Sequence, residues 1–371
     1  MVKAPGHQQN QTSETTCIGL LTNKRKDIVM LTRLGLVRLI FAGLAVSLIT
    51  TSFSCTEQNA ARPGSVAVKA PTVKFVQGDN KIDVMIGAKH FTSYLYGNQL
   101  TKPALFPVYT PSGIMVSRGY PLMKKVEGES TDHLHHTGIF FGYGEVCDND
   151  FWREPNSMPP QIKHARMTKI TDGVGAGKLS TVMHWVDKKG QVLLEEKRDM
   201  VFQAAEDEYA IDFSIDLTAQ HTKVVFNDTK EGMFAIRAAD WLRENASGKY
   251  VGTGTYLSSD GDKTEKNIWG KRARWVCLEG QKDGKTIGVA IVNHPSSVNY
   301  PTYWMVRAYG LFSANPLGQY VFEKKRNPES AKPFLLTLEP GKTAHFRFLI
   351  IIYEGPRTKE QLERRFEQFA K

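Results

Sequence analysis

Apolar and polar positions alternate in short runs along most of the chain from Val73 onward. The clearest run covers residues 209–217, where every second side chain is apolar and the intervening ones are Asp212, Ser214 and Asp216. A period of two is typical of a half-buried antiparallel strand. Further runs of this kind occupy residues 81–86, 191–202, 286–292, 333–338 and 343–353. The turn sequence Glu339-Pro-Gly-Lys342 predicts a hairpin between the last two runs.

Helical periodicity is nearly absent before the C-terminal segment. There, Thr358 and Gln361 have the spacing of a capping box, and Leu362, Phe366 and Phe369 lie on one side of a predicted helix. No clear linker divides residues 73–356. We therefore predict an all-β fold, in which residues 73–371 form one large antiparallel β-sandwich with a short C-terminal helix. Two tandem sandwiches are the structural alternative.

The N-terminal segment has the pattern of an export signal. Arg33 and Arg38 precede an apolar run from Leu39 to Ile49, and small residues lead to Cys55. This order is typical of a secretory signal peptide, and Cys55 stands where a lipoprotein would carry its lipid. We expect residues 1–54 to be a leader with its true start at Met30, and residues 55–72 to be a polar tether. The protein is then an exported periplasmic or outer-membrane lipoprotein. An uncleaved membrane helix is the alternative.

The composition and charge of the chain indicate which partners are expected. The chain of 371 residues is 41% apolar, which allows a large core, and its 48 Gly and Pro residues suit a turn-rich β protein. The formal net charge is +10, of which residues 1–54 contribute +4. The rest is spread over a long chain with no basic patch interleaved with aromatics, so nucleic acid is not an expected partner.

The cysteines exclude two further classes of protein. Cys17, Cys55, Cys147 and Cys277 form no CxxC pair, which argues against a zinc ribbon or a thioredoxin-like site. Without the leader and a lipidated Cys55, Cys147 and Cys277 could pair with each other or remain two free thiols.

The densest chemistry lies between Glu127 and Glu145. His133, His135 and His136 fall within four positions, and acids stand on both sides of them. On a strand, His133 and His135 would share one face and His136 would take the other. Paired imidazoles can divide acid and base roles or bind a metal. Glu127, Glu129, Asp132 and Glu145 could complete either arrangement. Individually, each histidine could instead satisfy backbone groups where a strand begins.

Other polar and aromatic residues are candidates for a pocket wall. Trp152 follows Asp148, Asn149 and Asp150, and an indole beside acids and amides suits a sugar ring. Arg237 is flanked by apolar residues, so a carboxylate partner is expected, for anion binding or for tying two strands. The second dense patch contains His294, Tyr303, Trp304, Arg307 and Asn315. An aromatic core strand would explain Tyr303 equally well.

Several motifs together resemble a known family. They are Asp132-His-Leu-His-His-Thr-Gly-Ile-Phe-Phe-Gly-Tyr-Gly144, Asp150-Phe-Trp152, Asp228-Thr-Lys-Glu-Gly232 with Arg237, Trp269-Gly-Lys-Arg-Ala-Arg-Trp275, and His294-Pro295 with Pro301-Thr-Tyr-Trp-Met-Val-Arg-Ala-Tyr-Gly-Leu-Phe-Ser-Ala-Asn-Pro316. Over roughly residues 73–355 the chain resembles the bacterial PmoA-like family, labelled methane oxygenase PmoA. The resemblance implies a soluble β-sandwich protein of carbohydrate-using bacteria, similar to galactose mutarotase-like sandwiches, which use His and Glu as acid and base on sugars.

Methane oxygenation itself is not expected. The methane monooxygenase subunit of that name is an integral membrane protein, whereas residues 56–371 contain no apolar run long enough to span a bilayer.

The leading hypothesis is an enzyme that performs acid–base chemistry on a small sugar or an oligosaccharide, as an epimerase, lyase or hydrolase. His133, His135 or His136 would transfer the proton, and Glu231 or Glu145 would be the partner. The expected substrate-binding residues are Trp152, Arg237, His294, Tyr303, Trp304, Arg307 and Asn315. In this hypothesis no cofactor is required, and the membrane is met only through the lipid anchor.

Two alternatives belong to other classes. One is an enzyme that uses a divalent metal held by His133, His135 and His294. The other is a glycan-binding lipoprotein without catalytic activity, for which a cluster of three histidines is not needed.

Overall fold

The computed structural model describes residues 70–123, 127–153, 159–244 and 252–371. The predicted leader, the start at Met30, the lipid site at Cys55 and most of the tether lie outside the described residues. By its internal contacts, the chain from Val66 to Lys371 is one compact unit.

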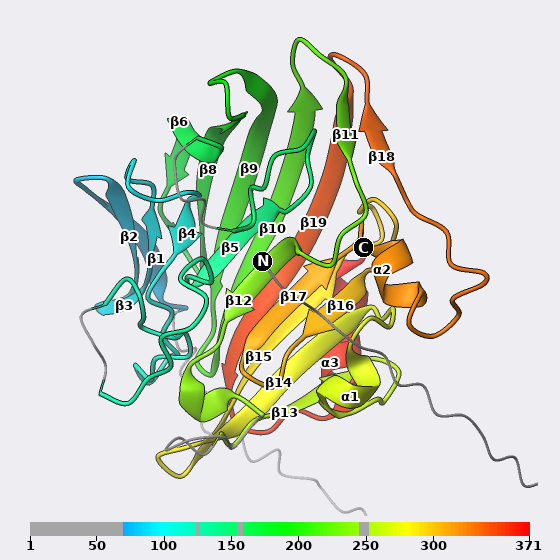
Figure 1. Ribbon diagram of the computed structural model, residues 1–371. Helices are drawn as coiled ribbons and strands as arrows, with labels where there is room; N and C mark the ends of the chain where they lie inside the picture. Colours follow the sequence, from blue (N-terminus) through cyan, green and yellow to red (C-terminus); the bar gives the residue numbers. More distant parts are fainter. Residues whose placement is uncertain (1–69, 124–126, 154–158, 245–251) are drawn as a thin grey trace, which may run out of the picture. The chain divides into compact units, whose positions relative to one another are not determined.

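Two large antiparallel sheets and one small sheet make up the fold, which confirms the predicted all-β sandwich (Figure 1). The nine-stranded sheet has the order β16-β17-β12-β5-β4-β3-β2-β1-β7, and the eight-stranded sheet has the order β13-β14-β15-β19-β10-β9-β8-β6. The strands of the first sheet are β1 (Thr72–Gly78), β2 (Lys81–Ile86), β3 (Lys89–Leu95), β4 (Ala104–Leu105), β5 (Ile139–Tyr143), β7 (Gly173–Val174), β12 (Gly232–Arg237), β16 (Tyr303–Val306) and β17 (Leu311–Asn315). Those of the second are β6 (Gln161–Thr171), β8 (Ala176–Val186), β9 (Val192–Ala204), β10 (Glu208–Ala219), β13 (Thr255–Ser258), β14 (Trp275–Lys282), β15 (Lys285–Asn293) and β19 (Thr343–Glu354).

The remaining elements are short. A two-stranded sheet pairs β11 (Val224–Phe226) with β18 (Leu336–Leu338). The helices are the 3-10 turn η1 (Asp240–Leu242), α1 (Thr264–Ile268), α2 (Gln319–Glu323) and α3 (Lys359–Phe369). Among the described residues, none of the helices is both long and apolar enough to span a bilayer.

The alternating runs became strands, with one exception in how they pair. The predicted runs 81–86, 191–202, 209–217, 286–292 and 343–353 fall on β2, β9, β10, β15 and β19, whereas of the run 333–338 only Leu336–Leu338 form a strand, β18. The turn at Glu339–Lys342 forms, with the amide of Lys342 donating to the carbonyl of Glu339 over 2.9 Å. However, the strands on its two sides do not pair with each other, because β18 pairs with β11 while β19 lies between β10 and β15. The predicted hairpin is therefore wrong, although its turn is present.

Three apolar layers follow from the alternation. The main core lies between the two large sheets and receives Phe141, Phe234 and Trp304 from the nine-stranded sheet. A second layer lies between the eight-stranded sheet and α3, where Leu362 and Phe369 are buried. The third layer covers the outer face of the nine-stranded sheet, beneath α1 and α2, and contains Phe140. This third layer is the floor on which the candidate site is built.

Two local predictions can be compared directly with the structure. The capping box of α3 is present, since the side chain of Thr358 accepts from the amide of Gln361 and the side chain of Gln361 accepts from the amide of Thr358. Cys147 and Cys277 are both free thiols. Burial raises the pKa of the Cys277 thiol to about 12.

Candidate functional site

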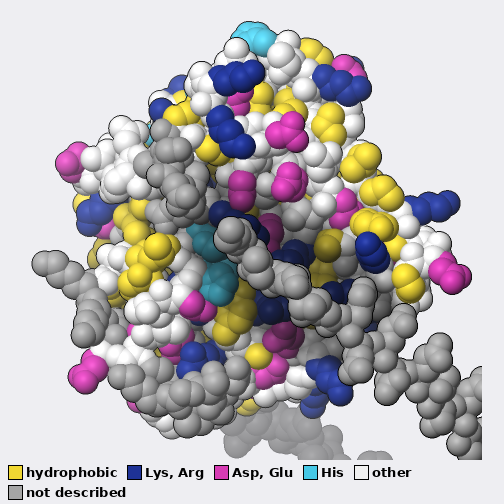
Figure 2. All heavy atoms as spheres, viewed as in Figure 1, with side chains coloured by type: hydrophobic (Ala, Val, Ile, Leu, Met, Phe, Trp, Pro, Cys, Tyr) yellow, Lys and Arg dark blue, Asp and Glu magenta, His cyan; other side chains and the backbone are white. Residues whose placement is uncertain are grey.

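A cavity of about 550 Å³ opens on the outer face of the nine-stranded sheet. Figure 2 shows histidine side chains at this hollow, with Lys, Arg and acidic side chains around it. Its walls come from distant parts of the sequence. The lining residues are His133, His135, His136, Arg153, Lys230, Glu231, Trp269, Met305, Arg307, Tyr309, Val321 and Lys325. The histidine stretch and the patch after β16 therefore meet in one pocket.

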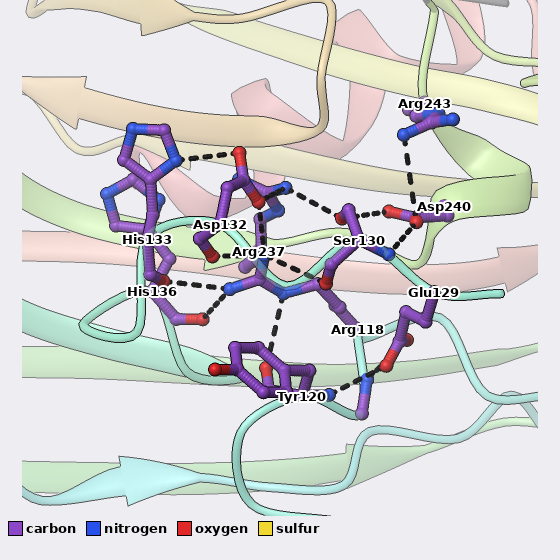
Figure 3. A network of polar contacts seen from close by, with 11 residues as sticks. Arg118, Tyr120, Glu129, Ser130, Asp132, His133, His136, Arg237, Asp240 and Arg243 are labelled. Carbon is purple, nitrogen blue, oxygen red and sulfur yellow. Dashed lines mark hydrogen bonds and ion pairs between the residues drawn. The ribbon is translucent and has the colours of Figure 1, made fainter. Parts of the chain in front are cut away.

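The three histidines lie on a tight turn before β5, not on a strand. The amide of His136 donates to the carbonyl of His133 over 3.1 Å, and His133 has a φ of 46°. The prediction that His133 and His135 share a strand face is wrong. The turn is held from below by the buried guanidinium of Arg118, which donates to the carbonyls of Asp132 and His133 at 2.7 and 2.8 Å (Figure 3). These long-range hydrogen bonds replace the ladder bonds of a strand.

Asp132 links this turn to β12. Its carboxylate accepts from Arg118 at 2.6 Å and from Arg237 at 2.7 Å, and both arginine side chains are fully buried. Its second oxygen lies 2.7 Å from Nδ1 of His133. Partial burial alone would raise the pKa of Asp132, but Arg237, the hydrogen bond with His133 and Arg118 outweigh it and lower that pKa. A carboxylate fixed in this way accepts the Nδ1 proton of His133 and leaves Nε2 as the free ring nitrogen.

The rings of the turn stack on an aromatic wall. The ring of His133 is parallel to those of His136, 4.8 Å away, and Tyr309, 5.1 Å away. His135 meets His136 edge-on at 4.2 Å. Beneath them, His136 also contacts the buried ring of Trp152. This packing fixes the ring planes at the pocket floor.

Two of these histidines are held neutral. Burial, followed by the positive charges of Lys102 and neighbouring groups, lowers the pKa of His135 to about 3. Burial also lowers the pKa of His136 far below its usual range, with His135 and Arg237 acting in the same direction. Among the described residues, neither ring nitrogen of His136 has a hydrogen-bond partner. These two imidazoles therefore add polar surface to the pocket but no charge.

The charged groups of the wall are mostly cationic. Arg153, Lys230, Arg307 and Lys325 line the cavity, whereas Glu231 is the carboxylate among the lining residues. Glu231 lies within ion-pair distance of Lys230, at 2.5 Å, and of Arg153, at 3.5 Å.

Helix α2 is positioned over the pocket by an acidic anchor. The carboxylate of Asp228, just before β12, accepts from the amides of Tyr320 and Val321 at 2.7 and 3.0 Å. Partial burial raises the pKa of Asp228 despite these hydrogen bonds. The anchor brings Val321 and Lys325 to the rim.

Comparison with known proteins identifies the family. A model of a family of unknown function, DUF6807, matches residues 81–367. The chain belongs to this family. A search of curated proteins found no match to the DUF6807 chain. Its resemblance to the PmoA-like family stays a prediction.

Solved structures that are similar to this DUF6807 chain include several galactosidases. The galactosidase domain of an α-galactosidase–sucrose kinase is 11% identical, with a TM-score of 0.42 over 76% of this chain and 42% of that one. A GH36 α-galactosidase from Geobacillus stearothermophilus is 11% identical, with a TM-score of 0.40 over 76% and 40%. The α-galactosidase from Lactobacillus brevis is 10% identical, with a TM-score of 0.39 over 80% and 41%. The chain thus spans about two fifths of these enzymes, and the likeness concerns the fold alone.

Some residues predicted for the DUF6807 site lie in the core instead. Trp304 is fully buried between the sheets, where Nε1 donates to the carbonyl of Ala273 over 3.0 Å. Tyr303 stacks on Phe322 of α2 and donates to Glu323. The structure does not place either side chain among the pocket-lining groups, because β16 turns its alternate positions inward and toward α2.

Asn315 and Glu145 are also outside the pocket lining. The side chain of Asn315 is buried and ties the carbonyl of Thr229 to the amide of Leu317. Glu145 is exposed, and its backbone carbonyl accepts from Asn227. Trp152 and Arg237 lie one layer below the lining, where they support the histidine turn.

His294 lies on the other sheet. It follows β15, bonds to Ser296 at 2.7 Å and to Arg347 at 3.3 Å, and packs against Phe369 of α3. The ligand set His133, His135 and His294 is therefore not brought together. Among the described residues, no group of three or more His, Cys, Asp or Glu side chains has the arrangement needed to hold a metal ion.

Three cationic residues of the site are not marked by any motif in the sequence. Arg118 and Lys102 come from the loops around β4, and Lys325 follows α2. Lys102 is almost fully buried and donates to the carbonyl of Trp152 over 2.7 Å. A lysine or arginine in a loop is normally predicted to be exposed to solvent. Only the folded structure therefore shows that these cations support the site.

Proposed function

We propose that this DUF6807 protein is an enzyme that performs general acid–base chemistry on a carbohydrate, with His133 as the group that transfers the proton. The main support for this proposal is the contact between His133 and Asp132 beside a cavity of about 550 Å³. Asp132 is itself held by the buried Arg118 and Arg237. A fixed carboxylate that orients an imidazole is a recurring arrangement of proton-transfer sites.

His133 suits this role better than its neighbours. Its side chain is 41% exposed, so a bound molecule can reach Nε2. His135 is a weak base because its pKa is about 3, and His136 is almost fully buried. His133 is also held at a positive φ, a conformation that costs free energy and is often found at functional sites.

Carbohydrate is the ligand class that the walls support. Tyr309 and Trp269 present aromatic surface to the cavity, and Glu231 stands among basic side chains that can bond hydroxyl groups. In the part of the chain that the structure describes, the indole nitrogen of Trp269 has no hydrogen-bond partner. The cavity volume lies within the usual range for small-molecule sites. In this proposal Glu231 accepts a sugar hydroxyl and His133 exchanges the proton.

A single histidine variant tests the proposal. With a panel of mono- and oligosaccharides, we expect wild-type protein to form product and His133→Asn to lose roughly 10²- to 10⁴-fold in kcat, with an unchanged circular dichroism spectrum. His345→Asn is the matched control. It breaks a partly exposed pair of the same length, 2.7 Å to Asp216, between the neighbouring strands β10 and β19. Its activity should equal that of wild type.

The contradicting outcomes are distinct. Full turnover by a folded His133→Asn variant would remove His133 from the mechanism. Binding of sugars without product formation by the wild type would favour a glycan-binding module.

A further inference from the structure

The wall of the pocket carries more positive than negative charge. Four basic side chains line the cavity beside one carboxylate, and the neutral His135 and His136 add none. Arg307 is paired with Glu265 at 3.0 Å. Glu231 is shared between Lys230 and Arg153. The ammonium of Lys325 lies 4.4 Å from the ring centroid of Trp269. The wall thus retains positive charge that a ligand can neutralise.

Uncharged polar groups at the same site also lack partners. Both ring nitrogens of His136, which is 1% exposed, and the indole nitrogen of Trp269 are buried without a hydrogen bond to any residue that the structure describes. A buried polar group left without a partner costs free energy. Both residues belong to the cavity lining, but these nitrogens themselves are shielded from solvent, so they lie just under the cavity surface. The positive charge of the wall is therefore the observation that indicates the kind of ligand.

We propose that the substrate is a uronate, a sugar whose ring carries a carboxylate, and that the cationic wall binds this carboxylate. The inference rests on the proposed function and specifies its substrate class. Arginine and lysine are the usual partners of carboxylates, and such charge-assisted hydrogen bonds are the stronger ones. Glu231 and Glu265 offset only part of the charge of the four basic side chains, so a neutral hexose would leave the remaining positive charge of the wall without a counterpart in the ligand.

The acid–base chemistry distinguishes a carboxylate from other anions. An imidazole is too weak a base to remove a proton from an ordinary sugar carbon. A carboxylate attached to that carbon changes this, because its electron-withdrawing effect grows once cations neutralise it. A sulfate ester would match the charge but would not stabilise the carbanion in this way. The presence of a histidine base beside a cationic wall therefore favours a uronate.

The reaction step balances with the groups present. Nε2 of His133 takes the proton from C5 of the uronate, and the electron pair of the C5–H bond moves into the carboxylate as an enediolate. Lys230, Arg307 and Lys325 stabilise the added negative charge. Return of the proton to C5 restores the C–H bond. Alternatively, the enediolate expels O4: the C4–O bond breaks, its electron pair leaves on O4, and a C4=C5 double bond forms. The proton held by His133 then passes to that oxygen.

The test compares uronate oligosaccharides with carboxyl-reduced and sulfated counterparts of the same length, using the full chain in D₂O. Expected results are saturable binding of the uronates and incorporation of deuterium at C5, or formation of the conjugated double bond. The deuterium incorporation and the double-bond formation should both disappear in His133→Asn. Lys325→Gln and Lys230→Gln should each weaken uronate binding about tenfold, with little effect on any neutral sugar. Lys342→Gln, on the exposed turn before β19, is the matched control.

The outcomes separate the two proposals. Turnover of carboxyl-reduced sugars as well as uronates, abolished in His133→Asn, would overturn the uronate assignment and leave the acid–base proposal standing. Preferential binding of the sulfated series would also overturn it. If no sugar in the panel yields a product that depends on His133, the proposed function itself fails. Binding of uronates that is insensitive to Lys325→Gln and Lys230→Gln would contradict the role of the cationic wall.

Discussion

At the scale of single residues, the alternation of side chains between the two faces of a strand decides which of them reach the site. The side chains of β16 alternate between two apolar layers: Trp304 and Val306 lie in the main core, and Tyr303 and Met305 lie in the outer layer. Arg307 and Tyr309 lie on the same face as Met305. This alternation could be read from the sequence. The residue type of Trp304 suits sugars, but the alternation places this side chain in the main core. Applying the period of two would have predicted Met305, Arg307 and Tyr309 as the pocket face.

The histidine turn could not be predicted in the same way. Its shape depends on Arg118, which lies outside the cluster and donates to the backbone carbonyls of Asp132 and His133. No local pattern in residues 133–136 reports such a contact. The cluster itself was informative because imidazoles and carboxylates are costly to bury unless they are paired, so its location was predictable while its geometry was not.

One prediction at this scale concerns acid stability. The folded-state pKa of His135, about 3, is below the ordinary value of 6.5 because of burial and the nearby charges of Lys102, His133, Arg153 and Arg118. As the pH falls from 7 to 4, the unfolded chain binds a proton at His135 and the folded chain does not. The free energy of unfolding therefore decreases over this range.

His135→Gln removes this contribution. We expect the melting temperature of the variant to fall less between pH 7 and pH 4 than that of wild type, as measured by differential scanning calorimetry. His136 contributes in the same direction and remains in the variant, so part of the fall persists. An equal fall in both proteins would show that His135 binds protons alike in the folded and unfolded states.

At the scale of elements, period and length decide what the sequence reveals. The long strands β9, β10 and β19 alternate over many positions and were predicted. Strands of two residues, β4 and β7, carry too little pattern to detect. Pairing is a separate question, as the turn at Glu339–Lys342 shows, because a turn constrains the chain locally while β18 finds its partner in β11, more than a hundred residues earlier.

Helix α3 offers a direct test of an element predicted from its cap. Thr358→Ala removes the acceptor for the amide of Gln361, and we expect unfolding by urea to become easier by about 1 kcal/mol. Thr358→Ser keeps the hydroxyl and should be close to wild type. Because α3 covers the eight-stranded sheet, away from the cavity walls, turnover per folded molecule should be unchanged in both variants. Equal stability of the Ala and Ser variants would mean that the cap contributes nothing.

At the scale of the whole molecule, the site exists only because the sandwich brings distant segments together. The turn before β5, the loop before β12, the residue after α1 and the end of β16 all border one cavity. The sequence shows which of these segments are rich in polar and aromatic residues, but each was a separate candidate. His294 illustrates the limit, since it lies in a motif next to Tyr303 yet packs under α3 on the other sheet. Convergence is a property of topology, which the alternation alone does not determine.

A buried ion pair on β9 also acts at this scale, because its arginine contacts the opposite sheet across the main core. On β9, Glu196 is fully buried and accepts from Nε of Arg198 at 2.7 Å and from Nε1 of Trp185 at 2.8 Å. The guanidinium of Arg198 lies 5.7 Å from the ring centroid of Phe141, on the opposite sheet. Removing one partner of a buried pair leaves the other charge uncompensated, which typically costs about 3–5 kcal/mol.

We therefore expect Glu196→Gln to lower the free energy of unfolding by that amount. The matched control is Glu195→Gln at the next position, whose exposed pairs with Arg166 and Lys197 at 3.7 and 3.9 Å should contribute at most about 1 kcal/mol. Urea unfolding followed by tryptophan fluorescence and by far-ultraviolet circular dichroism measures both. Since Glu196, Arg198 and Phe141 join the two sheets around one core, the two signals should shift together. Separate transitions, or equal effects of the two variants, would show that this pair does not couple the sheets.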